Sequence, residues 1–268
     1  MRAILLTSNL RRHQFVANRL AERLELAGVW QEEKSFQPLR YAESADDEAV
    51  IQSHFAARDA SEEAFFADHG ELRLRGGTAT RVAPGGCNSS DQLARMRALA
   101  PDAVLVFGTS LLKQPLIDAF AGRIINLHLG LSPYYRGAGT NFWPLVNGEP
   151  EYCGATIHFL DAGVDTGPIV AHARPAVAAG DGPHDVGNKT IIAAVEALAD
   201  AAVAHAASPL TGVEQWDGGR VYRRADFSAS AVRQLYANVQ RGMIDDYVRH
   251  RAERDRPLRL ILMGAQTR

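Results

Sequence analysis

The sequence predicts an α/β protein with a Rossmann-like, doubly wound and mostly parallel sheet. The chain opens with an apolar run at residues 3–7, a short polar turn and an amphipathic segment at residues 14–27. A strand, a turn and a helix in this order begin such sheets. Continuous apolar runs at residues 103–107 and 123–129 suit parallel strands that are covered on both faces.

The remaining elements of the sheet domain follow from periodicity and turn signals. Residues 154–160 and 168–177 alternate enough to predict two more strands. Three helices are predicted at residues 44–69, 91–100 and 184–206. The glycine-rich stretch 72–90 is predicted to be mostly a connection.

The chain divides most clearly near Ser208 and Pro209. We therefore expect a Rossmann-like catalytic domain at residues 1–208 and a small C-terminal appendage of helix and strand at residues 209–268. The appendage is predicted to hold a short strand at residues 219–222, one helix from residue 228 to about residue 251, and a final apolar run.

Composition and charge exclude several classes of protein. Hydrophobic residues make up 46% of the 268 residues and the net charge is -2, so a globular protein is expected and nucleic acid is a poor candidate partner. Arginines crowd residues 223–259, but the carboxylates between them indicate a solvated surface. Cys87 and Cys153 show neither metal-ligand spacing nor a disulfide framework. The N-terminal apolar run is too short for a signal peptide or a membrane span, so we expect a cytoplasmic protein without a membrane partner.

The nucleotide motifs of other α/β proteins are absent from the sequence. No GxGxxG follows the first apolar run, and no GxxxxGK[ST] occurs anywhere. Ligands of open α/β sheets bind beyond the carboxyl ends of the strands. The functional residues are therefore expected after residues 103–107 and at the end of 123–129.

Two polar side chains alternate at the end of the second of these strands. Asn126 and His128 lie two residues apart, so they share one face of the strand. An amide can donate a hydrogen bond to a developing oxyanion, and a neutral imidazole can accept a proton. Asp165, between Gly163 and Gly167, is the best candidate to orient the imidazole. The three residues suit transfer of an acyl-type group to an amine.

Each of these residues also has a purely structural explanation. A single histidine on a strand is more often structural than catalytic. Asn126 could end the strand, and either Asp161 or Asp165 could close a glycine turn. The case therefore depends on the residues taken together.

Taken together, three segments resemble a known family. The Asn126-x-His128 pair, the SPYYRG loop and the segment GATIHFLDAGVDTGPIV occur in this order. They resemble the formyltransferases that use 10-formyltetrahydrofolate, which include glycinamide ribonucleotide transformylase, methionyl-tRNA formyltransferase and sugar N-formyltransferases. The resemblance is strong over residues 104–171. It implies the formyltransferase fold and catalytic roles for Asn126, His128 and Asp165.

The resemblance also implies a folate site without a metal. The segment FGTSLL resembles the family loop whose backbone embraces the pterin ring, and the loop from Asp161 to Asp165 would form the opposite wall. The co-substrate would be 10-formyltetrahydrofolate. The residues expected to bind it are Phe107, Gly108, Thr109, Ser110, Leu111, Asp161, Gly163 and Val164.

The segment after the RG loop, which begins with NFW, most resembles the sugar-type members of the family. This resemblance implies that the acceptor is an amino sugar. The residues expected to bind it are Tyr134, Tyr135, Arg136, Gly137, Trp143 and His158, with Thr156 near the site. Aromatic rings could stack on a base or sugar, and Arg136 could meet a phosphate or carboxylate. Phe142 and Trp143 could equally be core residues. The family loop usually reads SLLP, whereas here it reads GLSP, a change that bears on acceptor fit.

Several alternatives remain open at this stage. The amine could belong to methionyl-tRNA, a hydroxyornithine-type compound or glycinamide ribonucleotide, and the protein could instead hydrolyse 10-formyltetrahydrofolate. A binding module without turnover is a third possibility. A metal hydrolase would use His128, His158, His172 and Asp165, although their spacing follows no metal signature. The apolar stripe of the C-terminal helix could pack on the body or form a homodimer.

Overall fold

The computed structural model describes residues 1–33 and 37–263. Seven strands form the central sheet in the order β3-β2-β1-β4-β5-β7-β8. Their bounds are β1 (Arg2–Ser8), β2 (Glu25–Glu32), β3 (Thr78–Val82), β4 (Ala103–Val106), β5 (Ile124–His128), β7 (Ala155–Phe159) and β8 (Ile169–Ala173). Strands β3 to β5 of this order are parallel, whereas β7 pairs antiparallel with both β5 and β8. The prediction of a doubly wound, mostly parallel sheet is confirmed.

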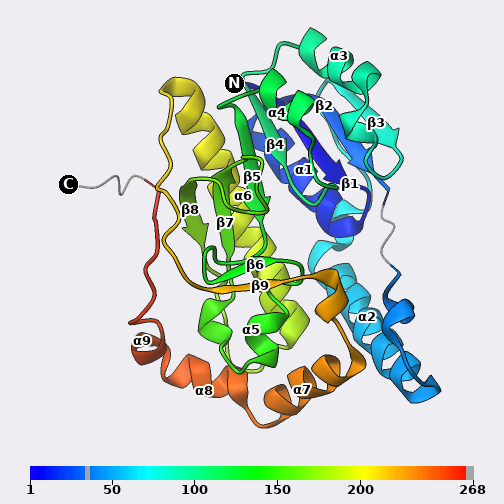
Figure 1. Cartoon of the computed structure of the whole chain (residues 1–268), viewed down its shortest axis with the longest axis vertical. Helices are drawn as coiled ribbons and strands as arrows, with labels where there is room; N and C mark the ends of the chain where they lie inside the picture. Colours follow the sequence, from blue (N-terminus) through cyan, green and yellow to red (C-terminus); the bar gives the residue numbers. More distant parts are fainter. Residues whose placement is uncertain (34–36, 264–268) are drawn as a thin grey trace.

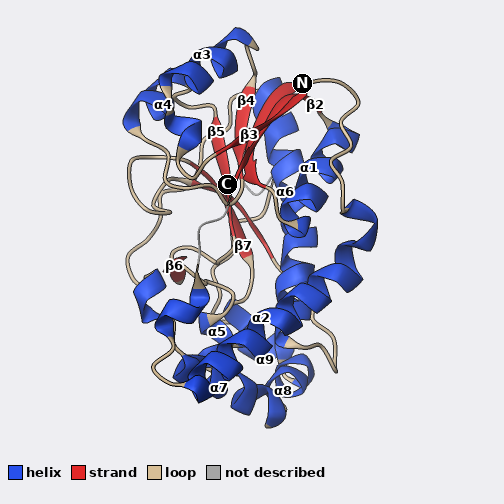
Figure 2. Cartoon of the chain, turned by 90° about the vertical axis from the view of Figure 1, so that its right-hand side faces the viewer, coloured by secondary structure: helices blue, strands red, loops and turns tan. Residues whose placement is uncertain are grey.

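Helices cover both faces of the sheet (Figure 2). On one face lie α1 (Arg11–Arg23) and α6 (Pro183–Ala207), whose core contains Phe15, Leu20 and Leu198. On the other face lie α3 (Ser90–Ala98) and α4 (Gln114–Ala119), packed with Trp30 and Met96. Strand side chains alternate between the two cores, as Ile4 and Leu5 of β1 do.

Helix α6 has the length and apolar composition of a membrane span, the one such helix in the described residues. Its side chains Ile191, Val195 and Leu198 are buried in the core between the sheet and α1. Burial of this face explains the apolar composition, so α6 is a core helix here. The expected cytoplasmic location stays a prediction.

The end of the molecule beyond the carboxyl ends of the parallel strands is largely helical (Figure 1). It contains α2 (Ala45–Phe66), β6 (Tyr135–Gly137), α5 (Trp143–Val146), β9 (Arg220–Tyr222), α7 (Ala229–Gln240), α8 (Met243–Arg249) and α9 (Arg251–Arg254). A third core joins Leu145 of α5 to Leu235 of α7 and Tyr247 of α8. Strand β9 pairs parallel with β6, so the C-terminal segment adds to the loop that follows β5. The domain boundary at residue 208 stays a prediction.

Five short 3-10 helices complete the part of the chain that the structure describes. They are η1 (Pro38–Tyr41), η2 (Ala67–His69), η3 (Gly86–Asn88), η4 (Pro150–Tyr152) and η5 (Arg224–Asp226).

Three sequence-based element predictions were wrong in part. The helix predicted at residues 14–27 ends at Arg23, and β2 starts at Glu25 without a loop. The buried apolar residues at the start of β2 continued the apolar spacing of the helix, so the prediction extended the helix too far. The stretch 72–90 contains β3, a strand at the edge of the sheet whose residues are mostly exposed. The single C-terminal helix is divided at Gly242, whose φ of 80° interrupts helical geometry.

Candidate active site

Asn126 and His128 lie at the carboxyl end of β5, where their alternation places them on one face of the sheet. The antiparallel neighbour β7 brings His158 opposite Asn126. The Asn126 Nδ2 atom lies 2.9 Å from His158 Nε2. Cross-strand pairing therefore adds a third polar side chain, His158, to the predicted pair.

Asp165 enters this cluster from the loop between β7 and β8. Its Oδ1 atom lies 3.3 Å from His128 Nδ1 and 3.8 Å from His158 Nε2. The Gly137 backbone N–H donates to the other oxygen, Oδ2, over 3.3 Å. Asp165 has a φ of 52°, in the left-handed region that aspartate tolerates better than most residues. The predicted convergence of Asp165 on His128 is present in the structure.

The charge states of His128 and Asp165 follow from burial and from one another. Burial lowers the pKa of His128 below its usual value, against the opposing attraction of Asp165. Burial alone would raise the pKa of Asp165, but His128, His158 and the Gly137 N–H together hold it below its usual value. The pair therefore presents a neutral imidazole beside a carboxylate at neutral pH, which is the state a general base needs.

Hydrogen bonds also fix the tautomer of His158 and the orientation of Asn126. His158 Nδ1 lies 2.8 Å from the Phe159 carbonyl oxygen, which can only accept, so Nδ1 carries the proton. The Nε2 atom of the neutral ring then accepts from the Asn126 amide. One Asn126 N–H is used in this way, and the second remains able to donate to an oxyanion.

The GLSP turn after β5 is held by Thr156 and His172. The Thr156 hydroxyl donates to the Gly130 carbonyl oxygen over 2.6 Å and accepts from the Ser132 N–H over 2.8 Å. His172 Nε2 donates to the Ser132 carbonyl oxygen over 2.8 Å, and its Nδ1 accepts from the Ile261 N–H over 2.9 Å. Burial lowers the pKa of His172 to about 4, so it is neutral.

These bonds bear on the metal-hydrolase alternative. Both ring nitrogens of His172 are committed to backbone groups, which leaves neither for a metal. Among residues 1–33 and 37–263, no group of three or more His, Cys, Asp or Glu side chains could hold a metal ion. Neither observation supports the alternative.

A known protein family covers most of the chain. Residues 26–202 match the formyl transferase family. The chain belongs to this family.

Individual relatives match shorter stretches. The chain is 36% identical over 88 residues to phosphoribosylglycinamide formyltransferase from Escherichia coli K12, covering 32% of this chain and 41% of that enzyme. It is 37% identical over 102 residues to methionyl-tRNA formyltransferase from Trichlorobacter lovleyi, covering 37% of this chain and 31% of that enzyme. The matches thus span less than half the length of these relatives. A sugar N-formyltransferase from a Shewanella species shares the fold, with a TM-score of 0.55, 16% identity, and coverage of 85% of this chain and 78% of that one.

The residues predicted to bind folate lie on two loops of this member of the family, after β4 and after β7. Leu111 and Val164 expose 73% and 51% of their surface. Phe107 is instead buried against the ring of His13, and Ser110 donates to the buried Glu32 carboxylate. Two further residues of this set, Gly108 and Thr109, are half-buried beside them.

Asp161 closes the second of these loops. Its carboxylate accepts from the Gly163 N–H over 3.0 Å and from the Thr166 hydroxyl over 2.9 Å. The turn-closing explanation weighed from the sequence therefore fits Asp161, and its contact with folate stays a prediction.

The residues predicted to bind the acceptor differ in their surroundings. Tyr135 is buried, its hydroxyl contacts Glu149 and Arg220, and burial raises its pKa. Trp143 is 8% exposed and stacks on Tyr222 with 4.3 Å between ring centroids. Tyr135 and Trp143 are therefore surrounded by other side chains as packing residues are.

Tyr134 and Arg136 of the same loop are only partly buried. The Tyr134 hydroxyl accepts from the Arg259 N–H over 2.7 Å. The Arg136 side chain makes no hydrogen bond or ion pair with the described residues, and its buried Nε atom has no partner. An unpaired guanidinium beside Gly137, which contacts Asp165, is free to meet an anionic group.

The sequence analysis did not predict two residues that contact the candidate catalytic cluster of Asn126, His128, His158 and Asp165. Gln215 Nε2 donates to the carbonyl oxygens of Asp165 and Gly167 over 2.8 and 2.9 Å, and thus holds the Asp165 loop. Thr140 Oγ1 lies 3.2 Å from His128 Nε2. Gln215 stands far from Asp165 in sequence, and no motif marks either residue.

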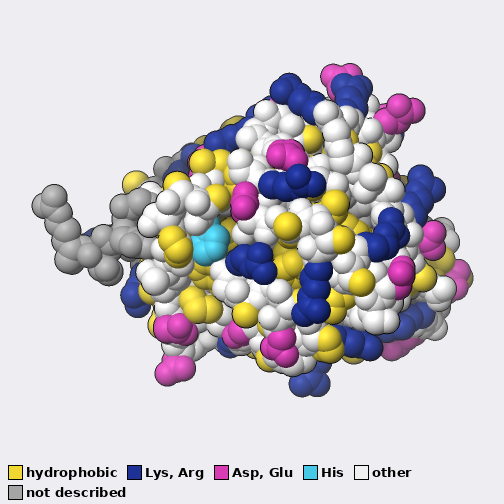
Figure 3. Space-filling model, turned by 90° about the horizontal axis from the view of Figure 1, so that it is seen from above, with side chains coloured by type: hydrophobic (Ala, Val, Ile, Leu, Met, Phe, Trp, Pro, Cys, Tyr) yellow, Lys and Arg dark blue, Asp and Glu magenta, His cyan; other side chains and the backbone are white. Residues whose placement is uncertain are grey.

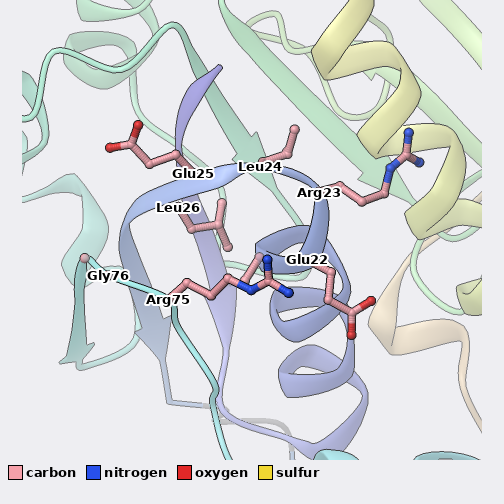
Figure 4. Close-up of a pocket in the computed structure, with 9 residues that line it drawn as sticks. Glu22, Arg23, Leu24, Glu25, Leu26, Arg75 and Gly76 are labelled. Carbon is pink, nitrogen blue, oxygen red and sulfur yellow. The ribbon is translucent and has the colours of Figure 1, made fainter.

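A cavity of about 530 Å³ lies at the start of β2 (Figure 4). Glu22, Arg23, Glu25 and Arg75 are among its lining residues. Strands β2, β1, β4 and β5 run parallel to one another. The start of β2 therefore lies at the amino ends of these strands, whereas His128 at the end of β5 lies at their carboxyl ends. This cavity is therefore separate from the catalytic cluster.

Basic and acidic side chains are mixed on the surface. The face seen in Figure 3 shows both signs interspersed. Near the C-terminus, Arg233 pairs with Asp46 and Asp47, and Arg254 pairs with Glu151. The arginine-rich segment is thus partly neutralised by carboxylates from other segments of the chain.

Proposed function

We propose that this protein transfers the formyl group of 10-formyltetrahydrofolate to a primary amine of a small acceptor. The observation that carries the proposal is the convergence of Asn126, His128 and Asp165 from one strand and one loop, with His128 Nδ1 3.3 Å from Asp165 Oδ1. Family membership supports the same reaction class.

The chemistry follows from the charge states of these groups. The acceptor amine attacks the formyl carbon, a C–N bond forms, and the carbonyl oxygen becomes an oxyanion. The free N–H of Asn126 stabilises that oxyanion, a contribution typically of about 2.7–4 kcal/mol. Neutral His128 takes the proton from the attacking nitrogen, and Asp165 stabilises the resulting imidazolium. His128 then returns the proton to N10 as the bond from the formyl carbon to N10 breaks.

Two features support the folate co-substrate. By the family resemblance, the pterin would lie between the loops after β4 and β7. Leu111 and Val164, on these two loops, expose large apolar surfaces that a ligand could cover. The contact surface with folate is part of this proposal.

An amino sugar, nucleotide-linked or sialic-acid-like, is the acceptor we propose. NFW follows the RG loop as in sugar-type members, and a likeness in fold to a sugar N-formyltransferase is compatible with it. Arg136, which lacks a partner among the described residues, would meet a phosphate or carboxylate of such an acceptor. The relatives that act on glycinamide ribonucleotide and methionyl-tRNA define the competing acceptors.

Calorimetric binding of 5-formyltetrahydrofolate, a stable isomer of the donor, tests the first half of the proposal. We expect micromolar-range binding to both the wild type and Asp165→Asn. Tetrahydrofolate formation with nucleotide-linked amino sugars then tests the second half, and should occur with the wild type only. Absence of folate binding would overturn the donor assignment. Release of formate at the same rate without any amine would instead identify a hydrolase.

A further inference from the structure

The imidazole of His128 has a polar partner on each side. Asp165 Oδ1 lies 3.3 Å from Nδ1, and the hydroxyl oxygen of Thr140 lies 3.2 Å from Nε2. Thr140 is only 3% exposed and follows the RG loop. The ring is therefore held between a carboxylate and a hydroxyl, and the hydroxyl has no role in the mechanism above.

The hydroxyl can serve the ring in both of its protonation states. Thr140 Oγ1 also contacts the Leu129 carbonyl oxygen, which can only accept. When Nε2 carries a proton, the hydroxyl accepts from it and donates to Leu129. When Nε2 lacks one, the hydroxyl can turn and donate to the ring. A hydroxyl has this capacity because it is both a donor and an acceptor.

Gly130 provides the space for this contact. A Cβ atom at residue 130 would lie 2.6 Å from His128 Nε2 and 2.6 Å from both Cβ and Oγ1 of Thr140. The backbone of Gly130 does not have a positive φ, so space and not conformation requires glycine here. A side chain at residue 130 would therefore displace His128 or Thr140.

We propose that Thr140 is a positioning residue for His128, and that its buried hydroxyl orients the imidazole from the nitrogen opposite the one that faces Asp165. The inference rests on the proposed function only in treating His128 as the base. The groups facing the ring are then Asp165, His158, the Thr140 hydroxyl and the Tyr135 backbone.

The sign of the effect on His128 follows from hydrogen-bond strength. The bond from a protonated ring to Thr140 is charge-assisted, whereas the bond from Thr140 to a neutral ring is not. Removing the hydroxyl therefore costs the charged form more, and the pKa of His128 should fall. A fall of about one unit corresponds to a tenfold change in the protonation equilibrium.

Nitrogen-15 NMR of histidine-labelled full-length protein tests this without donor or acceptor. The ring nitrogens of His128 are followed against pH in the wild type, Thr140→Val and Thr140→Ser, with His128→Gln for assignment. Thr140→Val keeps the shape and should lower the pKa, whereas Thr140→Ser keeps the hydroxyl and should restore it. A folded Thr140→Val protein with the wild-type pKa and ring tautomer would overturn the proposal.

A second pair of variants keeps the test decisive if Thr140→Val fails to fold. Thr140→Ala removes the hydroxyl and adds no group, whereas Thr140→Ser keeps the hydroxyl. The His128 pKa should be lower in Thr140→Ala than in Thr140→Ser. Equal pKa values in these two variants would contradict the proposed role of the hydroxyl. Failure to find formyl transfer would not change these readings, so the two proposals fail separately.

Discussion

At the residue scale, the candidate site depends on neighbours more than on any single side chain. His128 is neutral because it is buried, and Asp165 is ionised because imidazoles and a backbone N–H outweigh its burial. His158 Nε2 contacts the Asn126 amide, and His158 Nδ1 donates a hydrogen bond to the Phe159 carbonyl oxygen. The orientations of His128 and Asn126 thus come from neighbouring side chains, Asp165 and His158.

Asp165→Asn separates catalysis from folding. Asparagine keeps the size of the side chain and tolerates the φ of 52°, so the fold should persist. The amide cannot stabilise an imidazolium, and we expect kcat to fall by about 10²–10⁴. Steady-state kinetics on a responsive amine measures this, with Asp200→Asn, which loses only an ion pair between exposed side chains, as the matched control. A near-normal rate would remove Asp165 from the mechanism.

Trp143→Ala distinguishes packing from acceptor binding. Trp143 is 8% exposed and stacks on Tyr222, so we expect a loss in the free energy of unfolding of about 3–5 kcal/mol. Trp143→Phe keeps most of the buried ring and should lose much less. Chemical denaturation of both variants provides the comparison. A stable Trp143→Ala protein with a raised KM for the acceptor would show that the ring contacts substrate instead.

At the scale of elements, periodicity predicted most of the sheet, including β5, the strand that carries Asn126 and His128. Buried runs such as residues 103–107 carry a strong local signal, and Asn126 and His128 share a face by alternation alone. Edge strand β3 was missed because its residues are mostly exposed. The contacts of Gln215 with the Asp165 loop and of Thr140 with His128 arise from tertiary folding, which no local pattern encodes.

Two glycines in open space should respond to alanine in opposite directions. Gly242, at the break between α7 and α8, has a φ of 80°, and alanine there should lower stability by about 1–2 kcal/mol. Gly187 lies inside α6 without a positive φ, and alanine there should raise stability by about 0.5–1 kcal/mol. Urea titration of the two variants measures both effects. Equal shifts would mean that Gly242 does not require its left-handed conformation.

At the scale of the whole molecule, fully or partly buried histidines join segments that are far apart in the chain. His54 of α2 and His184 of α6 lie 4.7 Å apart between ring centroids, and the Tyr236 hydroxyl of α7 lies 3.4 and 3.3 Å from their nitrogens. His172 joins the GLSP turn to Ile261 near the C-terminus. Three neutral rings thus lie at contacts between the sheet domain and the C-terminal segment.

These three rings should make stability depend on pH below neutrality. Burial lowers the pKa of His54 to about 3, and those of His172 and His184 to about 4, from about 6.5 in the unfolded chain. Because the unfolded chain binds these protons first, stability is retained above pH 6.5 and is lost as pH falls towards 4 and then 3. Each ring contributes a slope of up to about 1.4 kcal/mol per pH unit in this window.

His54→Gln tests this contribution by removing one titrating ring. The variant loses packing and is less stable at pH 7.5, but its stability should fall less between pH 7.5 and 5 than that of the wild type. His250→Gln, at an exposed ring beside Asp246, controls for removal of a histidine as such. Denaturant unfolding at several pH values measures the slopes. An unchanged slope in His54→Gln would mean that His54 is protonated alike in the folded and unfolded chain, which would contradict its burial as a neutral ring between α2, α6 and α7.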